Sequence, residues 1–142
     1  MTAFEEVGEA LLTRVIDDFV ERMVGDVMIG FFFRNVDHAR LKRREYELAA
    51  RHLGADVPYS GRPLDVAHAP HPIQGGQFMR RLQLLKKSMD SHGLPERARA
   101  ILVAETERLR PLVTRDAGSD CDAEGAGRKV SEHFASLRKD KA

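Results

Sequence analysis

The chain has 142 residues, a length typical of one ordinary domain and too short for two large ones. Hydrophobic residues make up 42% and charged residues 32%, a globular composition that excludes disorder along the whole chain. The 23 basic and 22 acidic side chains give a formal charge of +1, which argues against a nucleic-acid binder. We see no apolar run long enough for a membrane span and no basic start typical of a signal peptide, so we expect a cytoplasmic monomer or weak homodimer.

Hydrophobic residues recur with the helical period, and alternating β-branched runs are almost absent, so we predict an all-α fold. The first helix is expected over 4–24, with a bend or break at Gly8. A short apolar segment, 27–33, follows and ends in three consecutive phenylalanines. After a loop in which Asp37 is the expected N-cap, a heavily charged helix is predicted over 38–53.

The stretch 54–73 holds four prolines and two glycines, so no long helix is expected there. A loop of this length in a compact domain is usually functional or disordered. It contains two of the six histidines, His68 and His71. Two further helices are predicted, one over 74–91 and one that opens at Pro95.

The end of the chain differs in composition from the rest. Pro111 is expected either to kink the last predicted helix or to mark its last turn. Residues 115–142 are predicted to form a flexible tail, so we divide the chain into a helical domain, 1–114, and this tail. Within the tail, 128–139 could form a short amphipathic helix that is unstable alone. The only cysteine, Cys121, lies there, which excludes an internal disulfide and a cysteine-based metal site.

The motifs of conventional hydrolases and phosphotransferases are missing from the sequence. We find no P-loop, no dinucleotide-binding glycine pattern, no H-E-x-x-H and no G-x-S-x-G. His68 and His71 are three residues apart, but prolines interrupt any helix that could bring them together as a metal pair. A conventional enzyme of these classes is therefore not expected.

Five segments within residues 4–114 together resemble the truncated, two-over-two hemoglobins, most closely the first group of that family. The absence of tryptophan favours the first group, because the other groups usually carry one on the helix after the proximal histidine. The resemblance implies an all-α, globin-like two-over-two helical sandwich around heme b, followed by the flexible C-terminal extension. The matching segments are VIDDFVERMVGD, FFFRNVDHARLKR, LGADVPYSGRPLDVAHAPHPI, GGQFMRR and HGLPE.

The resemblance also implies residues for a heme site. His68 would be the proximal ligand of the iron, with His71 as its rival and a plain surface-loop histidine as the alternative. Arg44 would approach a heme propionate, where a guanidinium pairs well with a carboxylate, or would be a solvated charge on its helix. Tyr59 and Arg62 would also approach the propionates, or would only shape the loop. The side chains expected to line the heme are Phe19, Val20, Phe32, Phe33, Leu41, Leu48, Phe78 and Leu82.

The distal side of this expected site departs from the family. Val20 stands where the family usually has a tyrosine that hydrogen-bonds bound oxygen, and Glu45 stands where it usually has glutamine. Glu45 lies on the apolar stripe of its helix, where a carboxyl is desolvated. Our hypothesis is that Glu45 is the one distal polar group, a donor when protonated and a proton acceptor when ionised. The alternative is that it turns outward and pairs with Lys42, Arg44 or a neighbouring loop.

Three functions remain open from the sequence. The first is a heme protein that reversibly binds oxygen, nitric oxide or carbon monoxide, for transport, sensing or detoxification. The second is a peroxidase-like or nitric-oxide-detoxifying enzyme with Glu45 as its catalytic acid–base group. Sustained dioxygenase turnover would need a separate reductase, because the chain has no flavin or nicotinamide domain. The third is a heme-free helical interaction module that uses the phenylalanine triplet and the tail as partner surfaces.

Overall fold

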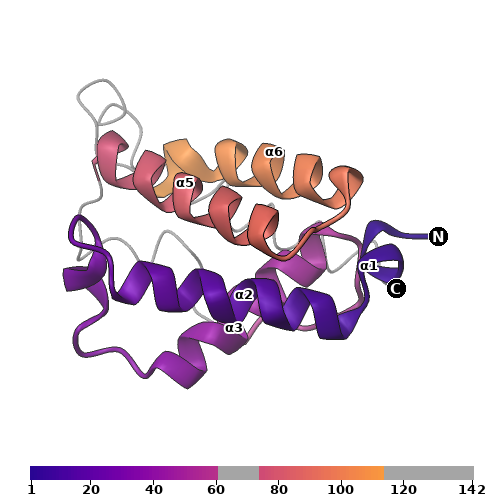
Figure 1. The fold of residues 1–142 in the computed structure, drawn as a ribbon, viewed down its shortest axis with the longest axis horizontal. Coiled ribbons are helices and arrows are strands. Elements are labelled where there is room, and N and C mark those ends of the chain that lie inside the picture. Colours follow the sequence, from indigo (N-terminus) through magenta and orange to yellow (C-terminus); the bar gives the residue numbers. More distant parts are fainter. Residues whose placement is uncertain (61–73, 114–142) are drawn as a thin grey trace.

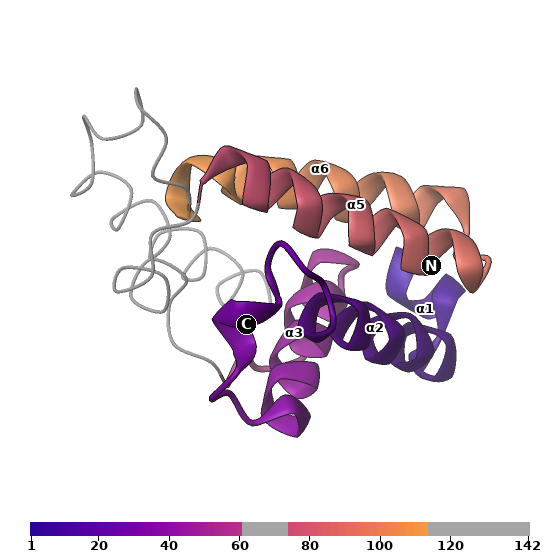
Figure 2. The same ribbon diagram turned by 60° about the vertical axis from the view of Figure 1, so that its left-hand side comes forward.

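The computed structural model describes residues 1–60 and 74–113, and every regular element within these ranges is a helix (Figure 1). In chain order the helices are α1 (Ala3–Val7), α2 (Glu9–Val24), the 3₁₀ helix η1 (Gly30–Phe33), α3 (His38–His52), α5 (Gly75–Ser91) and α6 (Glu96–Val113). Helices α2 and α3 form one layer, and α5 and α6 lie side by side in a second layer in both ribbon views (Figures 1 and 2). The predicted all-α, two-over-two arrangement is thus confirmed.

Several sequence predictions concern residues that lie outside the described ranges. The expected iron ligand His68, its rival His71 and the expected propionate contact Arg62 all lie within 61–73. The predicted tail, 115–142, lies outside the described residues as well, so the division of the chain at residue 114 stays a prediction. The helices that flank the first of these stretches, α3 and α5, are both described.

Helix boundaries follow the local chemistry that the sequence indicated. The helix expected over 4–24 is two helices, because Gly8, with φ +83°, adopts a left-handed backbone conformation that favours glycine. Asp37 caps α3, as predicted, by accepting the backbone N–H of Ala39 at 3.0 Å. Pro111 lies in the last turn of α6, as one of the two sequence predictions had it, and has no backbone N–H to donate there.

Helix α2 is the central element, because it packs against α3 in its own layer and against α5 in the other layer. Its inward side chains recur every three or four residues, and none of them is more than 2% exposed. Full burial of each such side chain contributes about 2 kcal/mol. The small hydroxyl of Ser88 on α5 donates to the carbonyl of Val15 at 2.6 Å, which holds the two layers close together. The inward residues of α2 are Leu12, Val15, Ile16, Phe19, Val20 and Met23.

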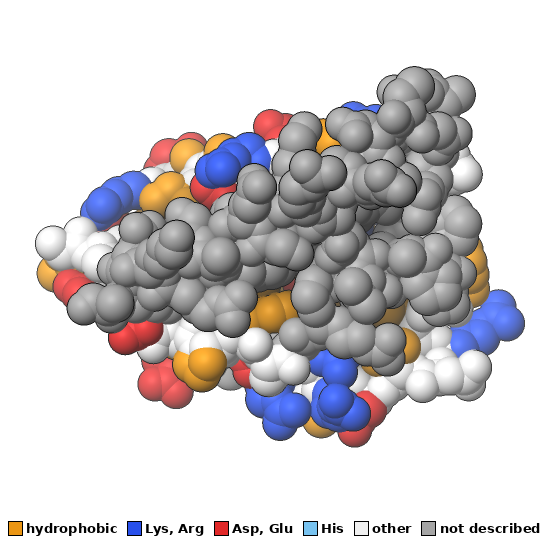
Figure 3. Space-filling view, turned by 180° about the vertical axis from the view of Figure 1, so that it is seen from behind, with side chains coloured by type: hydrophobic (Ala, Val, Ile, Leu, Met, Phe, Trp, Pro, Cys, Tyr) orange, Lys and Arg blue, Asp and Glu red, His pale blue; other side chains and the backbone are white. Residues whose placement is uncertain are grey.

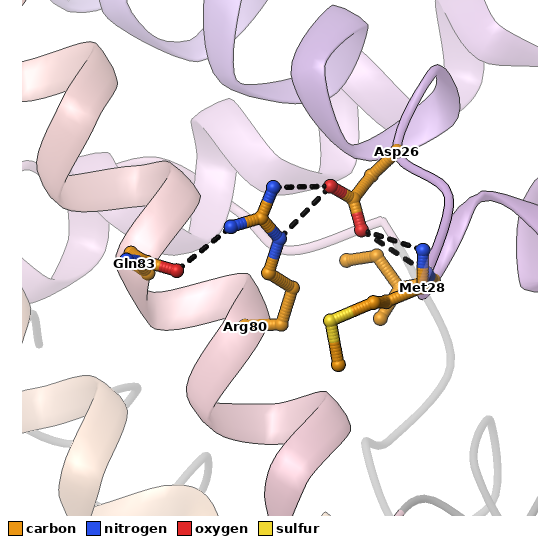
Figure 4. Close-up of polar contacts among 5 residues, drawn as sticks. Asp26, Met28, Arg80 and Gln83 are labelled. Carbon is orange, nitrogen blue, oxygen red and sulfur yellow. Dashed lines mark hydrogen bonds and ion pairs between the residues drawn. The ribbon is translucent and has the colours of Figure 1, made fainter.

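Asp26 ties the turn between α2 and η1 to the start of α5 (Figure 4). Its side chain is only 4% exposed, and one carboxylate oxygen accepts hydrogen bonds from Nε and Nη2 of Arg80 at 2.9 and 2.7 Å. The other oxygen accepts the backbone N–H groups of Met28 at 3.0 Å and Ile29 at 3.2 Å. Nη1 of Arg80 donates to Gln83 at 2.8 Å. The turn that leads into the phenylalanine triplet is therefore fixed against the second layer.

The molecular surface carries both signs of charge. Seen from behind, basic and acidic side chains alternate around the described part of this face (Figure 3), in keeping with the formal charge of +1. Three large apolar side chains near the turn after α2 are exposed: Val27 at 95%, Met28 at 48% and Phe31 at 47%. No described helix combines the length and the apolar composition that crossing a membrane requires.

Candidate functional site

The side chains predicted to line the heme lie on three helices and on η1. Because α2 packs against both α3 and α5, its residues stand between those of the other two helices. Phe32 and Phe33 of η1 are half-buried and pack against the core. The buried members of the set are Phe19 and Val20 from α2, Leu41 and Leu48 from α3, and Phe78 and Leu82 from α5.

Glu45 is held in an ion pair that crosses between the two layers. Its Oε2 accepts Nη2 of Arg81 from α5 at 2.8 Å, and the side chains of Glu45 and Arg81 are 18% and 26% exposed. The guanidinium carbon of Arg81 lies 5.0 Å from the centre of the Phe19 ring, a favourable cation–π distance. Lys42, one of the outward partners considered for Glu45, pairs instead with Glu21 at 3.2 Å. Sequence reasoning missed Arg81, which joins two of the predicted site residues.

A second carboxylate on α3 fixes Ser60, the last described residue before the stretch that contains the expected iron ligand. Glu47 is 8% exposed, and its Oε2 accepts the backbone N–H of Ser60 at 2.7 Å. The Ser60 hydroxyl donates to both oxygens of this carboxylate at 2.9 Å, and Arg43 lies 3.9 Å away. The chain therefore returns along α3 after that helix ends, and it is held there one residue before Gly61. Nothing in the sequence pattern singled out Glu47.

Tyr59 lies among the charged side chains of this part of α3. Burial raises the pKa of its phenol to about 12, and the negative charges of Glu45 and Glu47 act in the same direction. The positive charges of Arg44 and Arg81 oppose them but do not cancel them. Tyr59 is therefore a neutral phenol at ordinary pH, and its hydroxyl keeps its proton as a hydrogen-bond donor.

Arg51 is a buried cation with open hydrogen-bond donors. Its side chain belongs to a residue that is only 6% exposed, and Nε and Nη2 have no hydrogen-bond partner in the described part of the chain. Arg44 and Arg51 are seven residues apart, so they lie on the same side of α3, two turns from each other. A desolvated guanidinium without a partner is costly, and a carboxylate group is the partner that fits its geometry.

The described residues supply a lining for a cofactor rather than a set of metal ligands. Within residues 1–60 and 74–113, no group of three or more His, Cys, Asp or Glu side chains could hold a metal ion. The iron ligand that the resemblance implies, His68, belongs to the stretch outside these ranges.

Two layers of two helices, with buried apolar side chains on α2, α3 and α5, define a globin of the two-over-two type. Residues 2–115 match the family model of the bacterial-like globins, and the chain belongs to this family, in which its relatives are truncated hemoglobins.

Relatives from two groups of truncated hemoglobins are similar to this chain. Group 1 truncated hemoglobin GlbN of Mycolicibacterium paratuberculosis is 27% identical over 112 residues, which cover 78% of this chain and 82% of the relative. Group 2 truncated hemoglobin YjbI of Bacillus subtilis is 29% identical over 122 residues, which cover 82% of this chain and 92% of the relative. The family is thus shown, whereas the assignment to the first group stays a prediction.

Solved structures of truncated hemoglobins have the same fold. The truncated oxygen-avid haemoglobin of Bacillus subtilis superposes with a TM-score of 0.70 at 26% identity, covering 81% of this chain and all of that one. The Fe(III) form of the Tetrahymena pyriformis truncated hemoglobin gives a TM-score of 0.73 at 19% identity, with coverage of 82% and 100%. At that lower identity the likeness shows the fold alone.

The family implies heme iron as the cofactor, and the residues of this chain fit such a group. Porphyrin is a flat apolar ring with two carboxylate side chains, so it needs apolar walls and nearby cations. Leu41, Leu48 and Phe78 are buried apolar side chains on two different helices. The open donors of Arg51 and the half-buried Arg44 provide the chemistry that propionate carboxylates require.

Proposed function

We propose that the chain is a truncated hemoglobin that binds heme b and reversibly binds a diatomic gas at an iron held by His68. The observation that carries the proposal is the family match over residues 2–115 together with the buried apolar set on α2, α3 and α5. Heme supplies a ferrous iron able to take oxygen, nitric oxide or carbon monoxide when the protein offers one axial histidine. The name of the solved Bacillus subtilis relative, an oxygen-avid haemoglobin, supports oxygen as the first ligand to test.

The described residues have separate tasks in this proposal. The apolar side chains of α2, α3 and α5 exclude water from the faces of the ring. Arg44 and Arg51 hold the propionates, because each offers a guanidinium on the same side of α3. Glu47 fixes Ser60, from which the chain continues toward His68. The role of Glu45 as the distal acid–base group stays a prediction. In the structure its carboxylate forms an ion pair with Arg81.

The test is a set of absorption spectra of hemin-loaded protein in the ferric form, after reduction, and with carbon monoxide. The wild type is expected to show a Soret band that shifts when carbon monoxide binds. This shift should be lost in His68→Ala and kept in His71→Ala, which is the matched control in the same stretch. Loss in His71→Ala alone would transfer the ligand role to His71. No specific heme uptake by the wild type would overturn the proposal and favour a heme-free interaction module.

A further inference from the structure

The guanidinium of Arg81 contacts two of the predicted site residues, one on each of two other helices. One side is the ion pair with Glu45, in which Nη2 lies 2.8 Å from Oε2. The other is the ring of Phe19, a buried residue of α2, whose centre lies 5.0 Å from the guanidinium carbon. With only 26% of its side chain exposed, Arg81 is largely screened from water. Its position is therefore set by contacts with two helices other than its own.

The guanidinium of Arg81 has donors to spare. An arginine carries five N–H donors and no acceptor, and it stays protonated at every pH at which proteins fold. Only Nη2 is engaged, by Glu45, while Nε and Nη1 form no hydrogen bond with any described residue. A partly desolvated cation with free donors attracts anions and repels cations, and it has nothing to offer to a ligand that only donates hydrogen bonds.

The same ion pair offsets the negative charge with which Glu45 alone would repel an anionic ligand. An unpaired carboxylate at this point would repel an anionic ligand, whereas Arg81 neutralises it at 2.8 Å. Glu45 and Arg81 share their surroundings with Arg44 and Glu47, since the charges of all four act on the phenol of Tyr59. Of these, Glu47 accepts a hydrogen bond from the backbone of Ser60 and lies 3.9 Å from Arg43. The open donors at the site thus belong to arginine.

We infer that Arg81 is a specificity-determining residue that makes this site select small inorganic anions, such as azide, fluoride or nitrite, as ligands of the ferric iron. The inference rests on the proposed function, because it requires heme at the residues that Arg81 contacts. It assigns the preference for anionic over neutral ligands to one side chain on α5.

The experiment measures equilibrium binding of azide to hemin-loaded ferric protein by absorption titration, with neutral imidazole as the comparison ligand. The variants are Arg81→Gln, Glu45→Gln and the double variant that carries both changes. Arg97→Gln is the matched control, since its side chain is 55% exposed and pairs with Glu6 on α1. Urea unfolding of each variant checks that it folds. The double variant has no unpaired carboxylate, so it isolates the donors of Arg81 from the charge of Glu45.

We expect azide to bind about tenfold more weakly to Arg81→Gln and to the double variant, as for the loss of a charge-assisted hydrogen bond. Imidazole binding should not change, and Arg97→Gln should match the wild type. A double variant that binds azide as the wild type does would overturn the inference, because the single-variant loss would then come from Glu45 alone. Equal weakening of azide and imidazole would overturn it as well. Absence of heme uptake by the wild type would instead overturn the proposed function, and the inference with it.

Discussion

Tyr59 holds its proton more firmly in the folded state than an ordinary tyrosine does. Burial, reinforced by the charges of Glu45 and Glu47, raises the pKa of its phenol to about 12. The folded state therefore keeps this proton through the range in which an unfolded tyrosine loses it, near pH 10. The resulting stability is fully present below about pH 10 and is lost as pH rises toward about 12. We expect the ring signal of isotope-labelled Tyr59 in nuclear magnetic resonance to titrate at about pH 12.

The chain contains two tyrosines, so the assignment needs both single variants. Burial and the charge of Glu9 raise the pKa of Tyr46 too. In Tyr46→Phe, the remaining tyrosine signal is that of Tyr59. In Tyr59→Phe the titration near pH 12 should disappear. An ordinary tyrosine titration for Tyr59, close to pH 10, would show that its phenol is not buried as the structure has it.

Single residues also show where sequence reasoning ends. The place of Glu45 on the apolar stripe of α3 follows from its spacing, because residues three and four apart share a helix face. Its partner Arg81 is 36 residues away, and no local pattern specifies which α5 side chain meets α3. Arg51 and Glu47 are buried although their residue types predict exposure. Their burial follows from packing that periodicity does not encode.

The close approach of η1 to the end of α2 depends on one glycine. A Cβ added to Gly30 would lie 2.6 Å from the carbonyl oxygen of Val24, closer than real contacts allow, and a backbone atom cannot move aside as a side chain can. Gly30→Ala is therefore expected to lower the free energy of unfolding by about 2 kcal/mol. Urea unfolding followed by circular dichroism measures this change.

Gly76, in the first turn of α5, is the matched control for this substitution. A Cβ there would meet nothing within 4 Å, so Gly76→Ala should be neutral or stabilise the protein by about 0.5 kcal/mol. If the two alanine variants unfolded at the same urea concentration, η1 would not lie against α2 as the structure has it. The short helix itself could not be predicted from sequence, since four residues are too few for a periodic pattern.

At the scale of the whole molecule, the sequence predicted the helices better than their arrangement. The helical period and the caps placed the helix ends close to those observed, as Gly8 and Asp37 illustrate. The two-over-two arrangement was predicted from the family resemblance. An apolar face indicates that a helix is buried, but it does not indicate which helix packs against it. The long-range ion pairs that join the layers, such as Asp26 with Arg80, depend on that arrangement and could not be predicted before it was known.

The pair of Asp26 and Arg80 links the stability of the whole molecule to pH. Hydrogen bonds from Arg80 and from the backbone of Met28 and Ile29 hold the pKa of Asp26 below its ordinary value, and outweigh its burial. The folded state thus gains stability from ionised Asp26 above the unfolded pKa of 3.8, and it loses this gain as pH falls through the lower folded value. Asp26→Asn should lower the free energy of unfolding by about 2 kcal/mol at about pH 7.

The acid limb of the stability profile distinguishes this pair from a general loss of charge. Asp18 keeps part of the acid dependence in Asp26→Asn, because its pKa is also lowered: burial raises it, but the hydrogen bond and charge of Arg22 help to outweigh that effect. The difference in stability between the wild type and Asp26→Asn should therefore shrink as pH falls below 3.8 and through the lower pKa of folded Asp26. Glu107→Gln, an exposed change on α6, should follow the wild type throughout. A constant difference between Asp26→Asn and the wild type at every pH would contradict the linkage, since protonation of Asp26 would then contribute nothing.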